Sequence, residues 1–332
     1  MAGLGRYLVR RAITFIPTIF GVLFLTFTIA FLMPADPARV WAGGQKASPR
    51  VVEKIRKMYH LDEPFWSQFY YFTRAILTNQ IYSPVTHNLV SEEFLKRIPI
   101  TLNLAIMSMF LIVIMGVPMG IIAALKKDSA IDNAVRILAL IGYSTPSFWI
   151  AFIFMWVFYN QLGWMTLVGL PRPSTMITGI YLIDALILGE YKTFIEINRR
   201  LLLPAFILAF ISVGGVARYI RNTMLDVLSA DFILFAKAKG LPPFRLWRHA
   251  LKNSLIPVVT VLFFMFGGLM SGAIITETVF DIPGIGILYY TAISNLDIPV
   301  IVLTTLYAGL IVVVISLIVD ILYALIDPRV RL

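Results

Sequence analysis

Long apolar runs without a single charged side chain are the dominant pattern along this chain. A bilayer core of roughly 30 Å is crossed by about 20 apolar residues in a helix, and six runs meet or approach that length. Six such runs are too many for the core of a soluble protein, so the pattern predicts an all-α polytopic membrane protein with six transmembrane helices. The predicted spans are residues 12–33, 98–125, 137–159, 201–217, 254–276 and 298–319, of which the fourth is the shortest.

The composition supports the same class. Of the 332 residues, 59% are hydrophobic and only 14% are charged, which lies outside the usual range of soluble domains. The basic start of the chain, with Arg6, Arg10 and Arg11, could belong to a signal peptide. The run that follows has 22 residues, longer than the apolar core of about 7–15 residues in such peptides, so we expect residues 12–33 to be a retained span. The chain has no cysteine, which excludes disulfides and thiolate metal sites.

Lysine and arginine are distributed unevenly between the predicted loops. With the N-terminus inside the cell, the inner segments 1–11, 126–136, 218–253 and 327–332 carry 15 basic residues in 64 positions, against 13 in the 126 positions of the outer segments. Cytoplasmic loops are enriched in these residues. The pattern predicts a single membrane domain over residues 1–332 in the cell membrane, with both termini cytoplasmic. The net charge of +10 is then explained by the orientation of the chain in the lipid membrane, and it requires no nucleic-acid partner.

Two sizeable insertions are expected on the outer side, at residues 34–97 and 160–200. In the first, Ser48 and Pro49 can begin a short amphipathic helix, which either caps the ends of the spans or contacts a docking partner. In the second, the apolar segment MITGIYLIDALIL is interrupted by Asp184 and is too short to span a bilayer. We therefore expect this segment to lie at the membrane interface.

The chain shows no pattern typical of an enzyme. Its histidines, His60, His87 and His249, lie outside the spans and form no H-E-x-x-H pair, and the sequence has no G-x-S-x-G elbow. The spans hold no carboxylate pair of the kind that a proton relay uses, and no metal site is expected. A P-loop needs a Gly-Lys dipeptide to hold phosphates, and the sequence contains none. If a nucleotide drives this protein, another chain must bind it.

The predicted inner loop 218–253 contains the least membrane-like stretch, FAKAKGLPP. Asp231 can cap a helix over residues 232–239, and Gly240 follows where a helix ends in the left-handed conformation. A second helix can then start at Pro243 and present an apolar face with a basic rim. Such a helix–glycine–helix unit can either enter a groove of a neighbouring protein or lie on anionic lipid.

Four segments of the chain resemble one family of membrane transporters. DFILFAKAKGLPPFRLWRHALKNSLIPVV (231–259) resembles the cytoplasmic coupling-loop motif of ABC importer permeases, in the variant of the peptide/nickel family. Residues 6–38 are similar to the family's N-terminal signature for the first of its two permease subunits, the oligopeptide/dipeptide permease B-type chain. ETVFDIPGIG (277–286) and IDPRVR (326–331) resemble further signatures, so the resemblance covers nearly the whole chain.

The resemblance implies a type I ABC importer permease fold and a defined set of partners. These are a second, related permease subunit, two cytoplasmic ATP-binding subunits that hold ATP and magnesium, and an extracytoplasmic solute-binding protein. ATP binding would drive alternating access for peptides, oligosaccharides or a nickel complex. The chain departs from the general coupling motif at Leu234 and Phe235, which stand in place of its glutamate and first alanine. The residues expected to couple to the ATPases are Asp231, Ala236, Lys237, Lys239, Gly240, Leu241 and Arg245.

Candidates for the gate and the translocation path come from residues within or beside the spans: Asn103, Ser271, Glu277, Pro283 and Gly284. A polar residue such as Asn103 could instead form an interhelical hydrogen bond. We expect Glu277 to accept hydrogen bonds from backbone N–H groups across the turn at Pro283 and Gly284, as part of an outer gate. The alternative function is a self-sufficient secondary transporter or channel. Such a protein should show paired broken helices and an ionisable residue near the membrane midplane, and neither is evident in the sequence.

Overall fold

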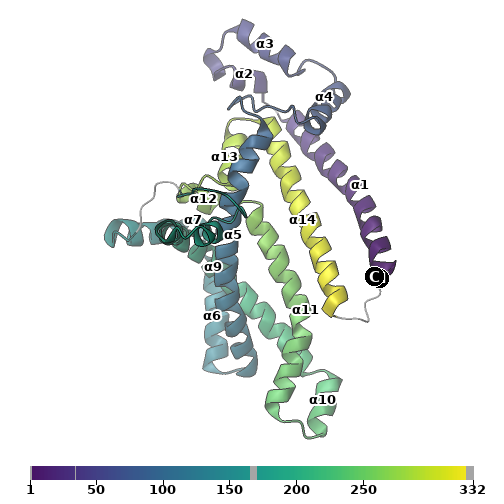
Figure 1. Cartoon of the computed structure of the whole chain (residues 1–332), viewed down its shortest axis with the longest axis vertical. Coiled ribbons are helices and arrows are strands. Elements are labelled where there is room, and N and C mark those ends of the chain that lie inside the picture. Colours follow the sequence, from purple (N-terminus) through teal and green to yellow (C-terminus); the bar gives the residue numbers. More distant parts are fainter. Residues whose placement is uncertain (1, 34, 165–169, 327–332) are drawn as a thin grey trace.

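The computed structural model describes residues 2–33, 35–164 and 170–326, which form helices and one isolated β-bridge between Tyr82 and Leu89. Figure 1 shows the helices as a bundle with a cap of short helices at one end. In chain order the elements are α1 (Ala2–Leu32), α2 (Pro37–Trp41), η1 (Gly44–Lys46), α3 (Pro49–Met58), α4 (Phe65–Leu77), α5 (Val90–Leu125), α6 (Ala130–Ser144), α7 (Ser147–Met155), η2 (Trp156–Gln161), α8 (Tyr181–Ile187), α9 (Tyr191–Leu228), α10 (Asp231–Ala238), α11 (Pro243–Met270), α12 (Ile274–Val279), α13 (Ile285–Ser294) and α14 (Ile298–Ile326).

Four of the described helices are long and apolar enough to cross a membrane alone: α1, α5, α9 and α14. Two bent pairs, α6 with α7–η2 and the two halves of α11, bring the number to six when each pair counts as one span. The all-helical membrane architecture is thereby confirmed. The predicted fourth span is only part of α9, whose 38 residues extend it at both ends.

The third predicted span, 137–159, is not one straight helix. The chain turns by 96° between α6 and the helix that follows it. The residue before a proline is disfavoured in the α conformation, and Thr145 accordingly adopts an extended ψ of 123° before Pro146. The break therefore falls at the proline within the apolar run. Hydropathy alone did not predict it, because the run contains no charged residue on either side of that proline.

The fifth predicted span, 254–276, has the wrong bounds. α11 starts at Pro243 and ends at Met270, so the second helix of the predicted hairpin and the span form one element. The two halves of α11 meet at 42° beside Pro257, because proline removes a backbone N–H and clashes with the preceding turn. The described residues thus contain two sharply bent helix pairs, which the hydropathy pattern did not predict.

The core lies where α5 packs along α9, with α8, α11 and α12 around this pair. A Cβ atom on Gly120 of α5 would lie 2.6 Å from the carbonyl oxygen of Ala217 on α9, so only glycine permits this close approach. Tyr181 and Ala185 of α8 are buried in this core. Part of the segment predicted to lie at the membrane interface thus forms α8, a helix of seven residues that packs on this core with one side.

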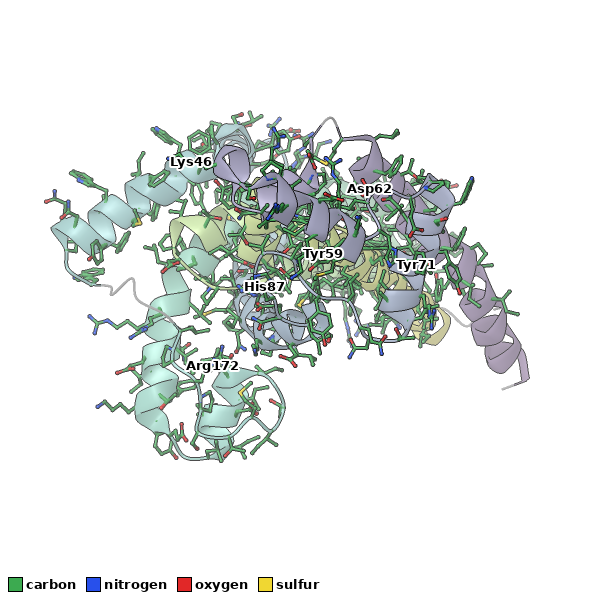
Figure 2. The ribbon with its side chains drawn as sticks, turned by 90° about the horizontal axis from the view of Figure 1, so that it is seen from above. Lys46, Tyr59, Asp62, Tyr71, His87 and Arg172 are labelled. Carbon is green, nitrogen blue, oxygen red and sulfur yellow. The ribbon has the colours of Figure 1, made fainter. Side chains whose placement is uncertain are left out.

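The first insertion and the predicted coupling loop lie at opposite ends of the molecule. In Figure 1, α2, α3 and α4 cover the upper end, and α10 with the start of α11 projects at the lower end. Seen along the long axis, Tyr59, Asp62, Tyr71 and His87 of the first insertion gather over the bundle, while Arg172 of the second insertion lies apart (Figure 2). The start of α1 and the end of α14 both point toward the end that carries α10. The IDPRVR segment falls outside the described residues except for Ile326.

Candidate functional site

The hairpin formed by α10 and the start of α11 contains the predicted coupling residues. α10 runs over Asp231–Ala238, and its N-cap residue is Ala230. The prediction that Asp231 caps this helix is therefore wrong, because Asp231 is already the first helical residue. Its carboxylate still lies in the first turn, where a negative charge interacts favourably with the helix dipole.

Gly240 ends α10 in the conformation predicted from the sequence. Its φ is +79°, in the left-handed region that costs glycine nothing. The N–H of Gly240 donates to the Lys237 carbonyl at 2.9 Å, and the N–H of Leu241 donates to the Ala236 carbonyl at 3.2 Å. This pair of bonds is a Schellman closure, which satisfies helix-end carbonyls and turns the chain sharply toward Pro243.

The hairpin exposes aromatic side chains and buries smaller ones. Phe235 is 63% exposed and Phe244 is 72% exposed, while Ile233, Leu246 and Ala250 are buried. The other large apolar side chains exposed on this hairpin are Phe232, Leu234 and Trp247. α10 packs against α11 while the aromatic groups on the outside stay available to another surface.

A basic rim surrounds this aromatic face. Lys237, Lys239 and Arg245 are exposed, whereas Ala236 and Leu241 are half-buried. The ammonium group of Lys239 lies 4.4 Å from the ring centroid of Phe235, within the range of a cation–π contact. The coupling residues predicted from the sequence thus lie together on one projecting hairpin.

A second constellation surrounds Glu277 of α12. Its side chain is fully buried, and Oε2 accepts hydrogen bonds from the N–H groups of Gly286 at 2.7 Å and Ile287 at 3.1 Å. These N–H groups belong to the first turn of α13, whose dipole favours a carboxylate there. The predicted hydrogen bonding of Glu277 across the turn is confirmed.

Thr101 of α5 completes this constellation, although no motif in the sequence pointed to it. Its hydroxyl donates to Oε1 of Glu277 at 3.0 Å and accepts from the N–H of Ile285 at 2.8 Å. A Cβ atom on Gly284 would lie 2.6 Å from Oε2 of Glu277, so the turn after Pro283 needs glycine for close approach rather than for an unusual φ. The turn therefore locks α12 and α13 onto α5.

Asn103 and Ser271, the other path candidates, have structural partners. Asn103 is fully buried; its amide donates to the Pro99 carbonyl at 2.7 Å and its side-chain oxygen accepts from the N–H of Leu182 at 3.3 Å. In this structure it links α5 to α8, as the alternative of an interhelical hydrogen bond predicts, and its assignment to the translocation path stays a prediction. The hydroxyl of Ser271 donates to the Gly267 carbonyl at 2.9 Å, one helical turn earlier.

The first insertion is bonded to the turn that joins α13 to α14. Nε1 of Trp41 donates to the Leu296 carbonyl at 3.0 Å, and the hydroxyl of Ser83 donates to the carboxylate of Asp297. Asp297 also accepts from the N–H of Val300 at 3.2 Å and so caps α14. α13 is consequently held at its start by Glu277 and just beyond its end by the first insertion.

Two family models match this chain, one over its N-terminal third and one over most of the remainder. Residues 116–332 match the binding-protein-dependent transport system inner membrane component, and residues 4–105 match the N-terminal part of the membrane component of such systems. The chain is 37% identical over 330 residues to a dipeptide transport system permease protein, DppB, of Alkalihalophilus pseudofirmus, across 98% of this chain and 99% of the relative.

Two further relatives match at similar length. A probable D,D-dipeptide transport system permease protein, DdpB, of Escherichia coli is 40% identical over 316 residues, which is 93% of either chain. A di/tripeptide transport system permease protein, DppB, of Pseudomonas aeruginosa is 38% identical over 330 residues, which is 98% of either chain. These matches exclude the alternative of a self-sufficient secondary transporter or channel, because transport in this family depends on a separate binding protein. The chain belongs to the family of inner-membrane components of binding-protein-dependent transport systems, as a multi-pass permease rather than an enzyme.

Proposed function

We propose that this chain forms half of a translocation path for short peptides, together with a second, related permease subunit. Its relatives are named as permeases for dipeptides, tripeptides or D,D-dipeptides, and they match over nearly its whole length. Two ATP-binding subunits on the cytoplasmic side would bind and hydrolyse ATP. A solute-binding protein would deliver the peptide to the outer side.

The observation that carries the ATP-driven function is the aromatic face of the hairpin. Phe232, Phe235 and Phe244 are exposed at the end of the molecule opposite the first insertion. An exposed apolar face with a basic rim suits insertion into a groove of a protein partner. Because the second helix of the hairpin is continuous with α11, a push on the hairpin would reach the membrane span without an intervening loop.

The proposed orientation places the hairpin and both termini in the cytoplasm. Basic residues favour the cytoplasmic side, and the hairpin contributes Lys237, Lys239 and Arg245 to it. The first insertion then faces the binding protein. Its bonds to Leu296 and Asp297 would connect that docking side to α13, which we assign to the outer gate.

The test is a charge inserted into the aromatic face. Phe235→Glu in the assembled transporter should abolish co-purification of the ATP-binding subunits and uptake of a labelled dipeptide, because a carboxylate resists burial in an apolar groove. Phe235→Leu keeps the position apolar and serves as the matched control. If Phe235→Glu retains the ATP-binding subunits and imports dipeptide normally, the hairpin is not the coupling element and lipid binding becomes the better interpretation.

The energy source is tested in the same membranes. Dipeptide uptake should require co-expression of the ATP-binding subunits and of the binding protein. Uptake by this chain and its permease partner alone, at the same rate, would contradict an ATP-driven importer. Import of another solute class with the same dependence on ATP would contradict only the peptide assignment.

A further inference from the structure

A cavity of about 560 Å³ lies under the cap that the first insertion forms. Side chains of α1, α2, α3 and α4 line it, as do the segment 78–87 and the start of α14. Its volume is within the roughly 300–1,000 Å³ of small-molecule sites. The cavity, here called the cap chamber, is far from the coupling hairpin, and neither Glu277 nor Thr101 lines it.

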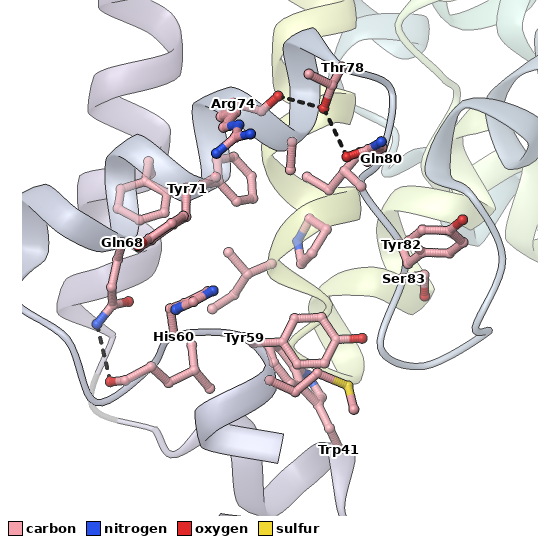
Figure 3. A pocket seen from close by; sticks show the side chains of 18 of the residues that line it. Trp41, Tyr59, His60, Gln68, Tyr71, Arg74, Thr78, Gln80, Tyr82 and Ser83 are labelled. Carbon is pink, nitrogen blue, oxygen red and sulfur yellow. Dashed lines mark hydrogen bonds between the residues drawn. The ribbon is translucent and has the colours of Figure 1, made fainter. Parts of the chain in front are cut away.

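Aromatic rings form two walls of the cap chamber. His60 and Tyr71 are stacked with ring centroids 4.0 Å apart and planes 10° from parallel. Trp41 and Tyr59 meet edge to face with centroids 5.0 Å apart. Figure 3 shows Tyr71 on the side of α4, Tyr59 and Trp41 on the opposite side, and His60 between them. Such walls accept a flat or bulky apolar group.

The backbone fixes both histidines of the cap chamber. His60 and His87 have φ values of 57° and 60°, in the left-handed region that residues with a Cβ atom rarely adopt. Nδ1 of His60 lies 2.6 Å from the carboxylate of Glu63, which holds the ring in its stacked position. The chamber wall is therefore built by specific contacts, and strained backbone of this kind concentrates at binding sites.

Arg74 supplies a cation at the edge of the cap chamber. Its side chain is exposed, and it has no ion pair with any of the described residues. Figure 3 places its guanidinium on the α4 side of the pocket, beside Tyr71.

The carboxylates around the cap chamber already have partners. Arg56 lies 2.6 Å from Asp36 and 3.7 Å from Asp62, Glu63 contacts His60, and Asp297 accepts from Ser83. A guanidinium without a carboxylate partner, next to aromatic walls, suits a ligand that brings its own carboxylate and an apolar group.

We propose that the cap chamber binds an aromatic amino-acyl carboxylate, the chemistry of a free C-terminal aromatic residue. The carboxylate pairs with Arg74, and the aromatic group lies between the His60–Tyr71 wall and the Trp41–Tyr59 wall. This site is separate from the translocation path, so the proposal goes beyond the proposed function and requires neither ATP hydrolysis nor peptide import. Ligand in the chamber would contact Trp41 and Ser83, whose bonds hold the turn between α13 and α14.

The experiment measures binding of N-acetyl-L-phenylalanine to the assembled transporter in nanodiscs by calorimetry, with empty nanodiscs as the blank. N-acetyl-L-phenylalanine amide, which has no carboxylate, tests whether binding requires that group. Decanoate tests whether the chamber binds a fatty acid instead. Arg74→Gln should weaken N-acetyl-L-phenylalanine about tenfold, the usual effect of losing a hydrogen bond to a charged group. Arg50→Gln, an exposed arginine of α3 that does not line the chamber, is the matched control.

A second variant tests the location of the ligand. Thr78 is exposed and lines the chamber, so Thr78→Trp should fill it and abolish binding while the fold is retained. The proposal is overturned if N-acetyl-L-phenylalanine does not bind, if the amide or decanoate binds as tightly, or if binding survives both Arg74→Gln and Thr78→Trp. ATP hydrolysis and dipeptide uptake are measured separately, so failure of this site leaves the proposed function untouched.

Discussion

Arg221 of α9 donates two hydrogen bonds to Asp132 at the start of α6: Nε lies 2.5 Å from one carboxylate oxygen and Nη2 lies 2.6 Å from the other. Asp132 is fully buried and also accepts the N–H of Asp128 at 2.9 Å. The pair therefore joins the loop after α5 to two helices. We infer that it holds this end of the bundle in one arrangement.

Removal of the arginine should destabilise the fold strongly. Arg221→Gln removes both hydrogen bonds from the buried carboxylate and leaves it only the more distant Arg136, whose Nε lies 3.8 Å away, so the cost should approach the about 3–5 kcal/mol of breaking a buried pair. Thermal unfolding of the purified complex should show a large decrease in midpoint temperature. Arg218→Gln, at an exposed position one turn earlier on α9, is the control and should change it little. Equal midpoints for the two variants would show that the pair contributes no stability.

Glu277 should tolerate glutamine better than alanine. Glu277→Gln keeps an oxygen that can accept from Gly286 and Ile287, so transport should fall modestly and equally for every substrate. Glu277→Ala leaves buried donors unsatisfied, each at a cost of about 1–3 kcal/mol, and should impair folding or gating severely. Uptake of neutral and cationic dipeptides at matched expression measures both variants. A loss confined to cationic substrates would indicate direct contact with substrate instead.

Gly240 should be the most sensitive position of the hairpin. Gly240→Ala incurs the left-handed backbone cost of about 1–2 kcal/mol, and Gly240→Arg adds a large side chain at the docking surface. No atom lies within 4 Å of a Cβ atom built there, so the hairpin itself has room for it. Co-purification of the ATP-binding subunits should be lost with arginine and retained with alanine. Lys239→Ala, which removes an exposed cation–π contact worth about 0.5–1 kcal/mol, should be mild. Arginine and alanine variants with the same behaviour would contradict a docking role for this turn.

Asp297 should make stability depend on pH. Burial raises the pKa of its carboxyl above the usual range, while hydrogen bonds from Ser83 and the N–H of Val300 oppose the shift only in part. The native state therefore keeps a proton that the unfolded state has lost above about pH 3.9, so stability should fall as pH rises from there through the raised pKa. Asp297→Asn should remove this fall in thermal unfolding curves, whereas Asp281→Asn at an exposed turn should not. An unchanged pH profile in Asp297→Asn would assign the dependence to another group.

The proposed topology can be tested because the chain has no cysteine. Ser48 and Ser229 are both exposed, the first before α3 and the second before α10. A membrane-impermeant thiol reagent on intact cells should label Ser48→Cys and leave Ser229→Cys unlabelled. Labelling both after the membrane is permeabilised controls for access. The reverse pattern on intact cells would invert the orientation.

The helical membrane class, the hairpin and the hydrogen bonding of Glu277 across its turn could all be predicted from the sequence. Each depends on a local property: apolar length against bilayer thickness, a glycine after a basic helix, or an acid facing a Pro-Gly turn. The resemblance in the coupling loop also pointed to the family that the comparisons confirmed. These features need few contacts from distant parts of the chain, which is why they were predictable.

Which prolines break a span, and which residues are partners across helices, became visible only in the three-dimensional structure. α5 continues through Pro99 and Pro118, whereas α6 ends just before Pro146. Hydropathy cannot tell these prolines apart, because packing against neighbouring helices decides whether the freed carbonyl can be accommodated. Thr101 meets Glu277 across 176 positions of sequence and Asp132 meets Arg221 across 89, so both pairs depend on how each helix is rotated against the next. The rotation of each helix depends on close packing between whole helix faces, so it cannot be predicted from any short segment of the sequence.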